Sequence, residues 1–309
     1  MGPTESSTLA RQSCYTSPMI RSRRPGALAL TSCTLLSTFM VGLTPASAAE
    51  ISPAVVACVT KAIGSAAQSL TSGDEKAMAR LTPAQQGRVR GCILTEGRAG
   101  KKASKVPPRL TASPIDPATV TSMSTFRSCA GHDFSGLNVT GAPERNRSMK
   151  HYLYVNQPWT ATGSIPVLAP VSGTAIVSVE EDYPLGSWVR ILSSKGWAFT
   201  AFHVDPTIRD GQKVTAGQQI AVFPPANAPS FMPDRMGEPQ ANFDFSLEST
   251  DGRIASFLDW MTPSARSAWE ARGFTTSVMT VSRVQRDAQP CPPDFPDGPG
   301  SAGFVSSRP

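Results

Sequence analysis

Apolar residues recur at two different periods along this chain, and the change of period divides it. Between residues 50 and 100 they recur at helical spacing, as in Val55, Val59 and Ile63. From about Thr111 onward, short runs alternate between apolar and polar positions, which is typical of strands in a half-buried sheet. The pattern therefore predicts a small helical segment followed by a mainly β domain.

Six runs in the second part fit strands, and turn-forming glycines separate several of them. The strand candidates are Val167–Leu168, Ala175–Val179, Trp188–Leu192, Trp197–Phe202, Gln219–Phe223 and Phe243–Leu247. We also expect a Pro-rich loop at Pro224–Pro239, a surface helix at Ser264–Arg272 and a late strand at Ser277–Val284. In the helical segment, Thr82 is a candidate N-cap, with Pro83 at the first helical position.

The N-terminal residues have the layout of a secretory signal peptide. Arginines precede an apolar run from Ala27 to Leu43, and Ala46-Ser47-Ala48 offers a cleavage site of small residues. We therefore expect an exported protein, periplasmic or extracellular, with no stable membrane span after signal cleavage.

These features together divide the chain into four parts. The expected parts are a signal peptide at 1–48, a small helical segment and linker at 49–105, a β domain at 106–290 and a disordered tail at 291–309. Where the second part meets the β domain, Gly97–Pro108 is expected to be an exposed linker, because it combines basic residues with two prolines.

Cysteine usage agrees with export. Cys14 and Cys33 lie in the expected signal peptide, which leaves four cysteines and three ways of pairing them. We favour a Cys58–Cys92 disulfide because both residues lie in one short helical segment, and Cys129–Cys291 would then tie the two ends of the β domain together. A cysteine zinc site is disfavoured because the chain contains no Cys-x-x-Cys pair.

Composition adds two limits. The 309 residues include 28 Pro and 24 Gly, which points to many turns in one large domain or two small ones. The formal net charge of +6 is mild and forms no basic stripe, so we expect no nucleic-acid partner. A weak attraction to an anionic cell wall is allowed.

Two half-motifs carry a resemblance to a known family. The first is Ala169-Pro170-x-x-Gly173, and the second is Asp210-Gly211-Gln212-Lys213-Val214-x-Ala216-Gly217-Gln218-x-Ile220. Together they resemble the duplicated hybrid motif of lysostaphin/LytM-type zinc endopeptidases, which cut peptidoglycan cross-links. Lipoyl and biotinyl carrier domains join such halves by a short turn, whereas here two strands and His203 intervene. The resemblance implies a LytM-like β-sandwich or barrel.

The resemblance also implies a zinc site, and the ligand motifs depart from it. The family holds zinc with an early His-x-x-x-Asp and the second His of a late His-x-His, and a further His supports catalysis. His203 matches that catalytic His, and His151 stands about where the first ligand is expected. Asn156 stands where the Asp would be, and Asn242-Phe243-Asp244 replaces the His-x-His.

Three histidine-based alternatives remain open at this point. His151, His203 and Asp244 could form a two-His, one-carboxylate metal set. Each histidine could instead be a structural group, hydrogen-bonded within the fold. The pair His132-Asp133 is weaker as a ligand pair, because adjacent side chains diverge in extended structure and a turn is the simpler interpretation.

The departures favour a non-catalytic or altered LytM-like domain without zinc, which binds or regulates something in the cell envelope. Its partner would be a cell-wall polymer or an envelope protein, bound in a groove that includes Asn156, Asn242, His132 and Asp133. One alternative is a zinc-dependent endopeptidase acting on peptidoglycan cross-links or peptides, with His151 and Asp244 as ligands and His203 as the catalytic residue. Another is a barrel-type adaptor or binding module.

Overall fold

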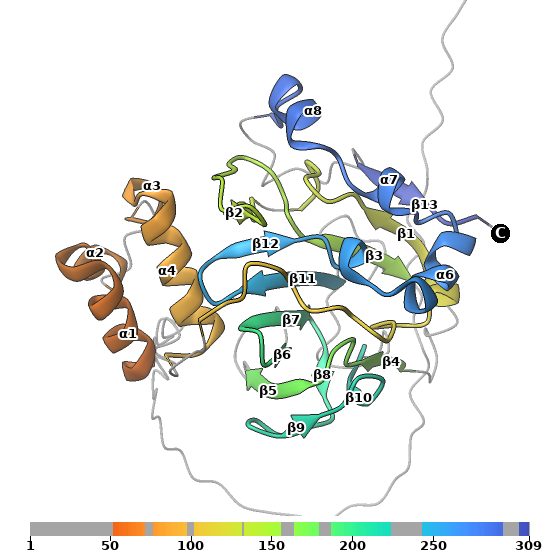
Figure 1. The fold of residues 1–309 in the computed structure, drawn as a ribbon, viewed down its shortest axis with the longest axis horizontal. Helices are drawn as coiled ribbons and strands as arrows, with labels where there is room; N and C mark the ends of the chain where they lie inside the picture. The colour runs from red at the N-terminus through yellow and green to blue at the C-terminus, as the bar shows by residue number, and fades with distance from the viewer. Residues whose placement is uncertain are drawn as a thin grey trace, which may run out of the picture. The chain divides into compact units, whose positions relative to one another are not determined.

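The fold is mainly β, with mostly antiparallel sheets and a few short helices, as expected from the alternating pattern (Figure 1). The computed structural model describes residues 52–71, 77–97, 102–131, 133–155, 164–178, 187–223, 243–292 and 303–308. The expected signal peptide at 1–48 and the expected loop at Pro224–Pro239 lie outside the described residues. No helix in the described ranges combines the length and the apolarity needed to cross a bilayer.

The N-terminal segment folds into a small group of helices. These are α1 (Pro53–Ile63), η1 (Gly64–Ala66), α2 (Ala67–Thr71), α3 (Ala77–Arg80) and α4 (Pro83–Leu94). The predicted N-cap of α4 is confirmed: the Thr82 hydroxyl accepts the backbone N–H of Gln85, and the Gln85 side chain returns to the Thr82 backbone. The predicted Cys58–Cys92 disulfide is also confirmed, and it joins α1 to α4 with Cα atoms 5.7 Å apart.

The larger sheet contains ten of the described strands. In the order β13-β1-β3-β11-β7-β6-β5-β9 they pair antiparallel, while β12 pairs with β11 and, in parallel, with β2. Their bounds are β1 (Val120–Ser124), β2 (Leu137–Asn138), β3 (His151–Val155), β5 (Gly173–Ser178), β6 (Trp188–Leu192), β7 (Trp197–Phe202), β9 (Lys213–Val214), β11 (Phe243–Ser249), β12 (Arg253–Ala255) and β13 (Phe304–Ser306).

The two half-motifs interlock. A second sheet has the order β4-β10-β8, formed by β4 (Ile165–Leu168), β10 (Gln219–Phe223) and β8 (Asp205–Pro206). The first half-motif begins directly after β4, and the second runs into β10. The Gly217 N–H of the second donates to the Ala169 carbonyl of the first at 2.8 Å. Gly217 has a φ of +85°, which a residue with a Cβ adopts only with strain.

One face of the larger sheet forms the main core. Phe199 on β7 and Phe245 on β11 are fully buried, with ring centroids 5.2 Å apart. The smaller sheet covers part of this face, and Phe223 stacks on Phe243. Phe257 and Trp269 extend the same cluster into the C-terminal helices. The remaining helices are η2 (Pro117–Thr119), α5 (Phe257–Trp260), α6 (Pro263–Ala271), α7 (Thr276–Met279) and α8 (Arg283–Ala288).

Three stretches differ from the sequence-based expectations. The expected strand at Ser277–Val284 is wrong, because α7 and the start of α8 occupy it, each with a hydroxyl N-cap. The expected disordered tail is wrong for 303–308, where β13 pairs with β1. The linker is not uniformly exposed, since Ala103 is buried and the Ser104 carbonyl accepts from the Trp197 indole at 3.0 Å.

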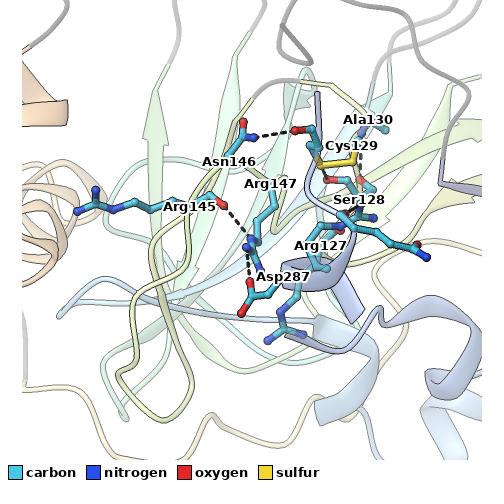
Figure 2. Close-up of a disulfide and its surroundings, with 11 residues drawn as sticks. Arg127, Ser128, Cys129, Ala130, Arg145, Asn146, Arg147 and Asp287 are labelled. Atoms are coloured by element: carbon cyan, nitrogen blue, oxygen red, sulfur yellow. Dashed lines mark hydrogen bonds and ion pairs between the residues drawn. A yellow bond between two sulfur atoms is a disulfide. The ribbon is translucent and has the colours of Figure 1, made fainter. Parts of the chain in front are cut away.

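The predicted Cys129–Cys291 disulfide is confirmed and lies in a charged network (Figure 2). Arg147 binds Asp287 of α8 at 2.6 Å, and the Asn146 amide donates to the Cys291 carbonyl at 2.9 Å. These contacts hold α8 and the chain that follows it against Asn146 and Arg147, while the Arg145 side chain points away from them in the same view. The disulfide therefore ties residues 162 positions apart in the sequence.

Helix α4 packs directly on the turn between β11 and β12, through glycines. A Cβ placed on Gly91 would lie 2.1 Å from the Thr250 carbonyl oxygen, and one on Gly87 would lie 2.7 Å from the Asp251 carbonyl oxygen. Because both clashes are with backbone, α4 would have to move to accept either side chain.

We expect Gly91→Ala to loosen α4 from the sheet. Alanine favours a helix by about 1 kcal/mol over glycine. Overpacking against backbone costs about 1–3 kcal/mol, so the clash should win and lower the free energy of unfolding. Urea unfolding and limited proteolysis between α4 and β1 would measure the effect. The exposed α4 substitution Ala84→Ser serves as a control, and a variant as resistant as that control would contradict close packing.

Candidate functional site

Strand β11 separates two chemically different faces. Phe245 and Leu247 point into the main core, whereas Asp244, Ser246 and Glu248 share the opposite face, as the period-2 alternation predicts. The structure nevertheless buries all seven residues of β11. The polar face is therefore an interior surface, which requires partners for its charges.

The central contact on this face is an ion pair between Lys150 and Asp244. The ammonium Nζ lies 3.3 and 3.4 Å from the two carboxylate oxygens. The side chains are only 3% and 0% exposed. Lys150 reaches Asp244 because Tyr152 on β3 is the register partner of Asp244, and Lys150 lies two positions earlier on the same face. A buried pair of this kind retains each charge only while the other is present.

Aromatic rings enclose the same ammonium. Its Nζ lies 3.9 Å from the ring centre of Phe202 and 4.3 Å from that of Phe134. Burial lowers the pKa of Lys150 below its usual value, while the nearby carboxylates of Asp244 and Glu248 oppose that shift. The ring faces and the Asp244 carboxylate thus replace the water that an exposed lysine would bind.

His203 lies at the edge of this arrangement. Its Nε2 atom is 3.9 Å from Asp244 Oδ2, and its side chain is 18% exposed. The residue follows β7 with a φ of +60°, a strained value for a residue with a Cβ. The structure therefore brings together two of the sequence-predicted site residues, His203 and Asp244. It adds Lys150, whose ammonium lies against the rings of Phe134 and Phe202.

His151 does not join them. It is the register partner of Phe245, so it shares the core face of the sheet and is separated from Asp244 by the sheet itself. The Ser124 carbonyl can only accept, so Nδ1 carries the proton at 2.8 Å, and Nε2 accepts from the Ser256 hydroxyl at 2.9 Å. Both ring nitrogens are therefore engaged, and the proposed set of His151, His203 and Asp244 is not assembled in this geometry.

The weaker candidates divide between described and undescribed residues. Asp133 forms a turn, because its Oδ1 accepts the backbone N–H of Ser135 at 3.0 Å and also the Ser135 hydroxyl. His132, Asn156 and Asn242 lie outside the described residues. Across the part of the chain that the structure describes, no group of three or more His, Cys, Asp or Glu side chains could hold a metal ion.

Sequence reasoning missed Lys150, the residue that completes this site. A lysine is seldom buried, so its residue type alone gave no sign of an interior role. The sequence does show that Lys150 and Tyr152, two positions apart, would lie on the same face of one strand. If β3 and β11 were known to be neighbours, that face would place both residues beside Asp244. The neighbour relation of β3 and β11 could not be obtained from the pattern, because the strands are far apart in the sequence.

Comparison with known proteins gives similarity only at the level of solved structures. The chain matches no protein-family model and no curated protein sequence. Among solved structures it is similar to an M23 metalloprotease, pseudoalterin, from the deep sea, with 11% identity over 49% of this chain and 74% of that one and a TM-score of 0.31.

Two further similar structures have the same TM-score of 0.31. One is a zinc-containing peptidase from Vibrio cholerae, with 18% identity over 49% of this chain and 40% of that one. The other belongs to the SpoIIQ–SpoIIIAH pore-forming complex, with 15% identity over 53% of this chain and 98% of that one.

We expect Lys150 and Asp244 to be energetically coupled. Removing one partner of a buried ion pair typically costs about 3–5 kcal/mol, because the other charge is left unpaired. Lys150→Met and Asp244→Asn should each destabilise by that order, and the double variant should lose less than the two combined. Urea unfolding of all four proteins would measure the coupling. Lys213→Met, at an exposed lysine, provides the control, and additive losses would argue against the pair.

His151 should make stability depend on pH. Burial lowers the pKa of His151 from its usual 6.5 to about 4. The unfolded chain therefore takes up a proton at a higher pH than the folded chain does. The free energy of unfolding should fall as pH falls from 6.5 to 4, by about 1.4 kcal/mol per pH unit, and the contribution should be fully present above 6.5.

The matched variant for this effect is His151→Gln, which does not titrate. Carboxylates also change stability at low pH, so the informative quantity is the difference in slope between the two proteins over the same window. Chemical denaturation at several pH values would measure it. Equal slopes would mean that His151 is not buried as a neutral ring.

Proposed function

We propose that this chain is an exported, non-catalytic LytM-like protein that acts in the cell envelope by binding rather than by hydrolysis. The observation that carries the proposal is the buried ion pair of Lys150 with Asp244. Asp244 stands where the resembled family places a zinc-ligating histidine, and the cation that faces it here is a side-chain ammonium.

The described residues do not fit a catalytic zinc. Such a site uses three protein ligands and leaves one position open for water. His203 and Asp244 are the two potential ligands that lie near each other, and His151 has both nitrogens engaged on the opposite face. The Lys150 ammonium lies against both Asp244 oxygens and would repel a divalent cation there.

Export is supported by two independent features. Disulfides persist in oxidising compartments, and both Cys58–Cys92 and Cys129–Cys291 are formed. The first 48 residues have the layout of a cleaved signal peptide. A periplasmic or extracellular location follows from this reasoning, and the partner we propose there is a cell-wall polymer or an envelope protein.

The zinc-endopeptidase alternative makes a different demand on the same residues. Lys150 would have to leave Asp244, and further ligands would have to come from positions such as 132, 156 or 242. The barrel-type adaptor alternative demands only the interlocked half-motifs. No contact among the described residues favours the peptidase, and the Lys150–Asp244 ion pair favours the non-catalytic binding role.

Metal content and wall binding of the mature chain test the proposal. After incubation with zinc and removal of the excess, elemental analysis should find far less than one zinc per chain. Co-sedimentation with purified peptidoglycan, or capture on envelope extract, should be unchanged by a chelator, since no metal takes part. Both measurements should be equal in wild type and in His203→Ala, with Lys105→Gln as an exposed control.

About one zinc per chain that is lost in His203→Ala and in Asp244→Ala, together with cleavage of peptidoglycan, would overturn the non-catalytic role. Failure to bind any envelope fraction, with the fold intact by circular dichroism, would overturn the binding role.

A further inference from the structure

A cavity of about 210 Å³ lies between α4 and the polar face of the larger sheet. Three charged residues line it: Arg90 from α4, Arg190 from β6 and Glu248 from β11. Lys150 and Asp244 do not line the cavity, although Phe134 and Phe202, which enclose the Lys150 ammonium, do. The polar face therefore carries a second group of charged side chains, and these border a cavity large enough for a small molecule.

Arg190 is the least satisfied of these charges. The residue is 7% exposed, and its guanidinium stacks on the Trp188 ring, with Cζ 3.6 Å from the ring centre. One terminal nitrogen donates to the Ile93 carbonyl of α4 at 3.1 Å. The Nε–H has no hydrogen-bond partner among the described residues. A buried charged donor without a partner is costly, so Arg190 is a charge that the described residues satisfy only in part.

A second unsatisfied atom lies next to it. Thr200 on β7 is the register partner of Arg190, so both side chains share the polar face. Thr200 is 0% exposed, and its hydroxyl also lacks a partner within the described ranges. Two adjacent strands thus direct unpaired polar atoms to the same part of this face.

The charge balance of the cavity favours an anion. Glu248 is the one carboxylate among these lining residues, and its charge acts on Arg190, so it offsets one of the two guanidinium charges. Arg90 lies 4.8 Å from the centre of the Phe134 ring, and no carboxylate of the described residues is within ion-pair distance of it. Guanidinium groups recognise planar carboxylates through paired N–H donors, which suits this pair of arginines better than a cation.

The remaining lining residues are mostly apolar and indicate that the ligand also has an apolar part. Leu94, Phe134 and Phe202 line the cavity with apolar surface, and Ile93, which is 47% exposed, stands where it meets the molecular surface. We propose that this cavity binds a small carboxylate with a short apolar body, whose carboxylate pairs with the guanidinium groups of Arg90 and Arg190 that line it. Because Arg90 and Ile93 belong to α4, the bound molecule would connect the helical segment to the sheet.

This site goes beyond the non-catalytic role and does not rest on it, since a peptidase with the same fold would retain the cavity. The test therefore reads binding alone and uses no zinc and no wall material. Its failure would leave the metal and wall measurements unaffected.

The experiment titrates the ¹⁵N-labelled mature chain with sodium butyrate and follows the arginine Nε–H resonances. The Arg190 signal is identified by its loss in Arg190→Lys. We expect a saturable shift of that signal, which reports binding at the same guanidinium, with an affinity of about 1 mM or tighter. Ile93→Trp, which fills the cavity mouth and keeps Arg190, should weaken butyrate binding about tenfold or more. The exposed arginine change Arg145→Lys should leave it unchanged.

Two comparison probes decide the chemistry. Butylamine has the same apolar body with a cation, and inorganic phosphate is an anion without an apolar body, so both should bind much more weakly than butyrate. Equal shifts with butylamine or phosphate would overturn the assignment to carboxylates. An Arg190 signal that none of the probes moves would overturn the site. Thermal unfolding of each variant confirms that a lost signal is not lost folding.

Discussion

The structure depends on the burial of β11 on both of its faces. Antiparallel sheets commonly leave one face in water, so the polar residues on that face are hydrated and need no partner within the protein. Here α4 and the segment around Phe134 cover the second face, so Asp244, Ser246 and Glu248 lose their water. Each must find a partner within the protein: Lys150, directly before β3, pairs with Asp244, and Ser246 donates to Glu248 on the same strand.

That requirement explains the arrangement of charges across the polar face. Lys150 on one side neutralises Asp244, and Ser246 occupies one oxygen of Glu248. On the far side, Arg190 donates to a carbonyl of α4, so the helix is held by a hydrogen bond as well as by the close packing of Gly91. The packing of α4 and the pairing of the charges beneath it therefore depend on each other. Without α4 the charges would be hydrated, and without their partners their burial would be unfavourable.

Local periodicity and simple counting were enough to predict part of this structure. The alternation placed Asp244 and Ser246 opposite Phe245, and the even number of mature cysteines led to both disulfides. Neither indicated which strands are neighbours, and so Lys150 was missed. The alternation also suggested a strand at Ser277–Val284, although hydroxyl N-caps at Thr275 and Ser282 decide for helices there. Pairing partners and tertiary cover are long-range properties, and local patterns carry little information about them.

The difference between this face and a zinc site can be argued from charge alone. A neutral histidine at position 244 would donate a lone pair to a cation and would leave no charge of its own. An aspartate there adds a negative charge to a surface that is 0% exposed at that residue, and some cation must offset it. A lysine already attached to the chain does so without capturing a ligand, and its Phe134 and Phe202 neighbours fix the ammonium against the carboxylate. With that ammonium in place, a divalent ion beside Asp244 would meet like-charge repulsion, while the polar face holds α4 and frames the cavity beside Arg190.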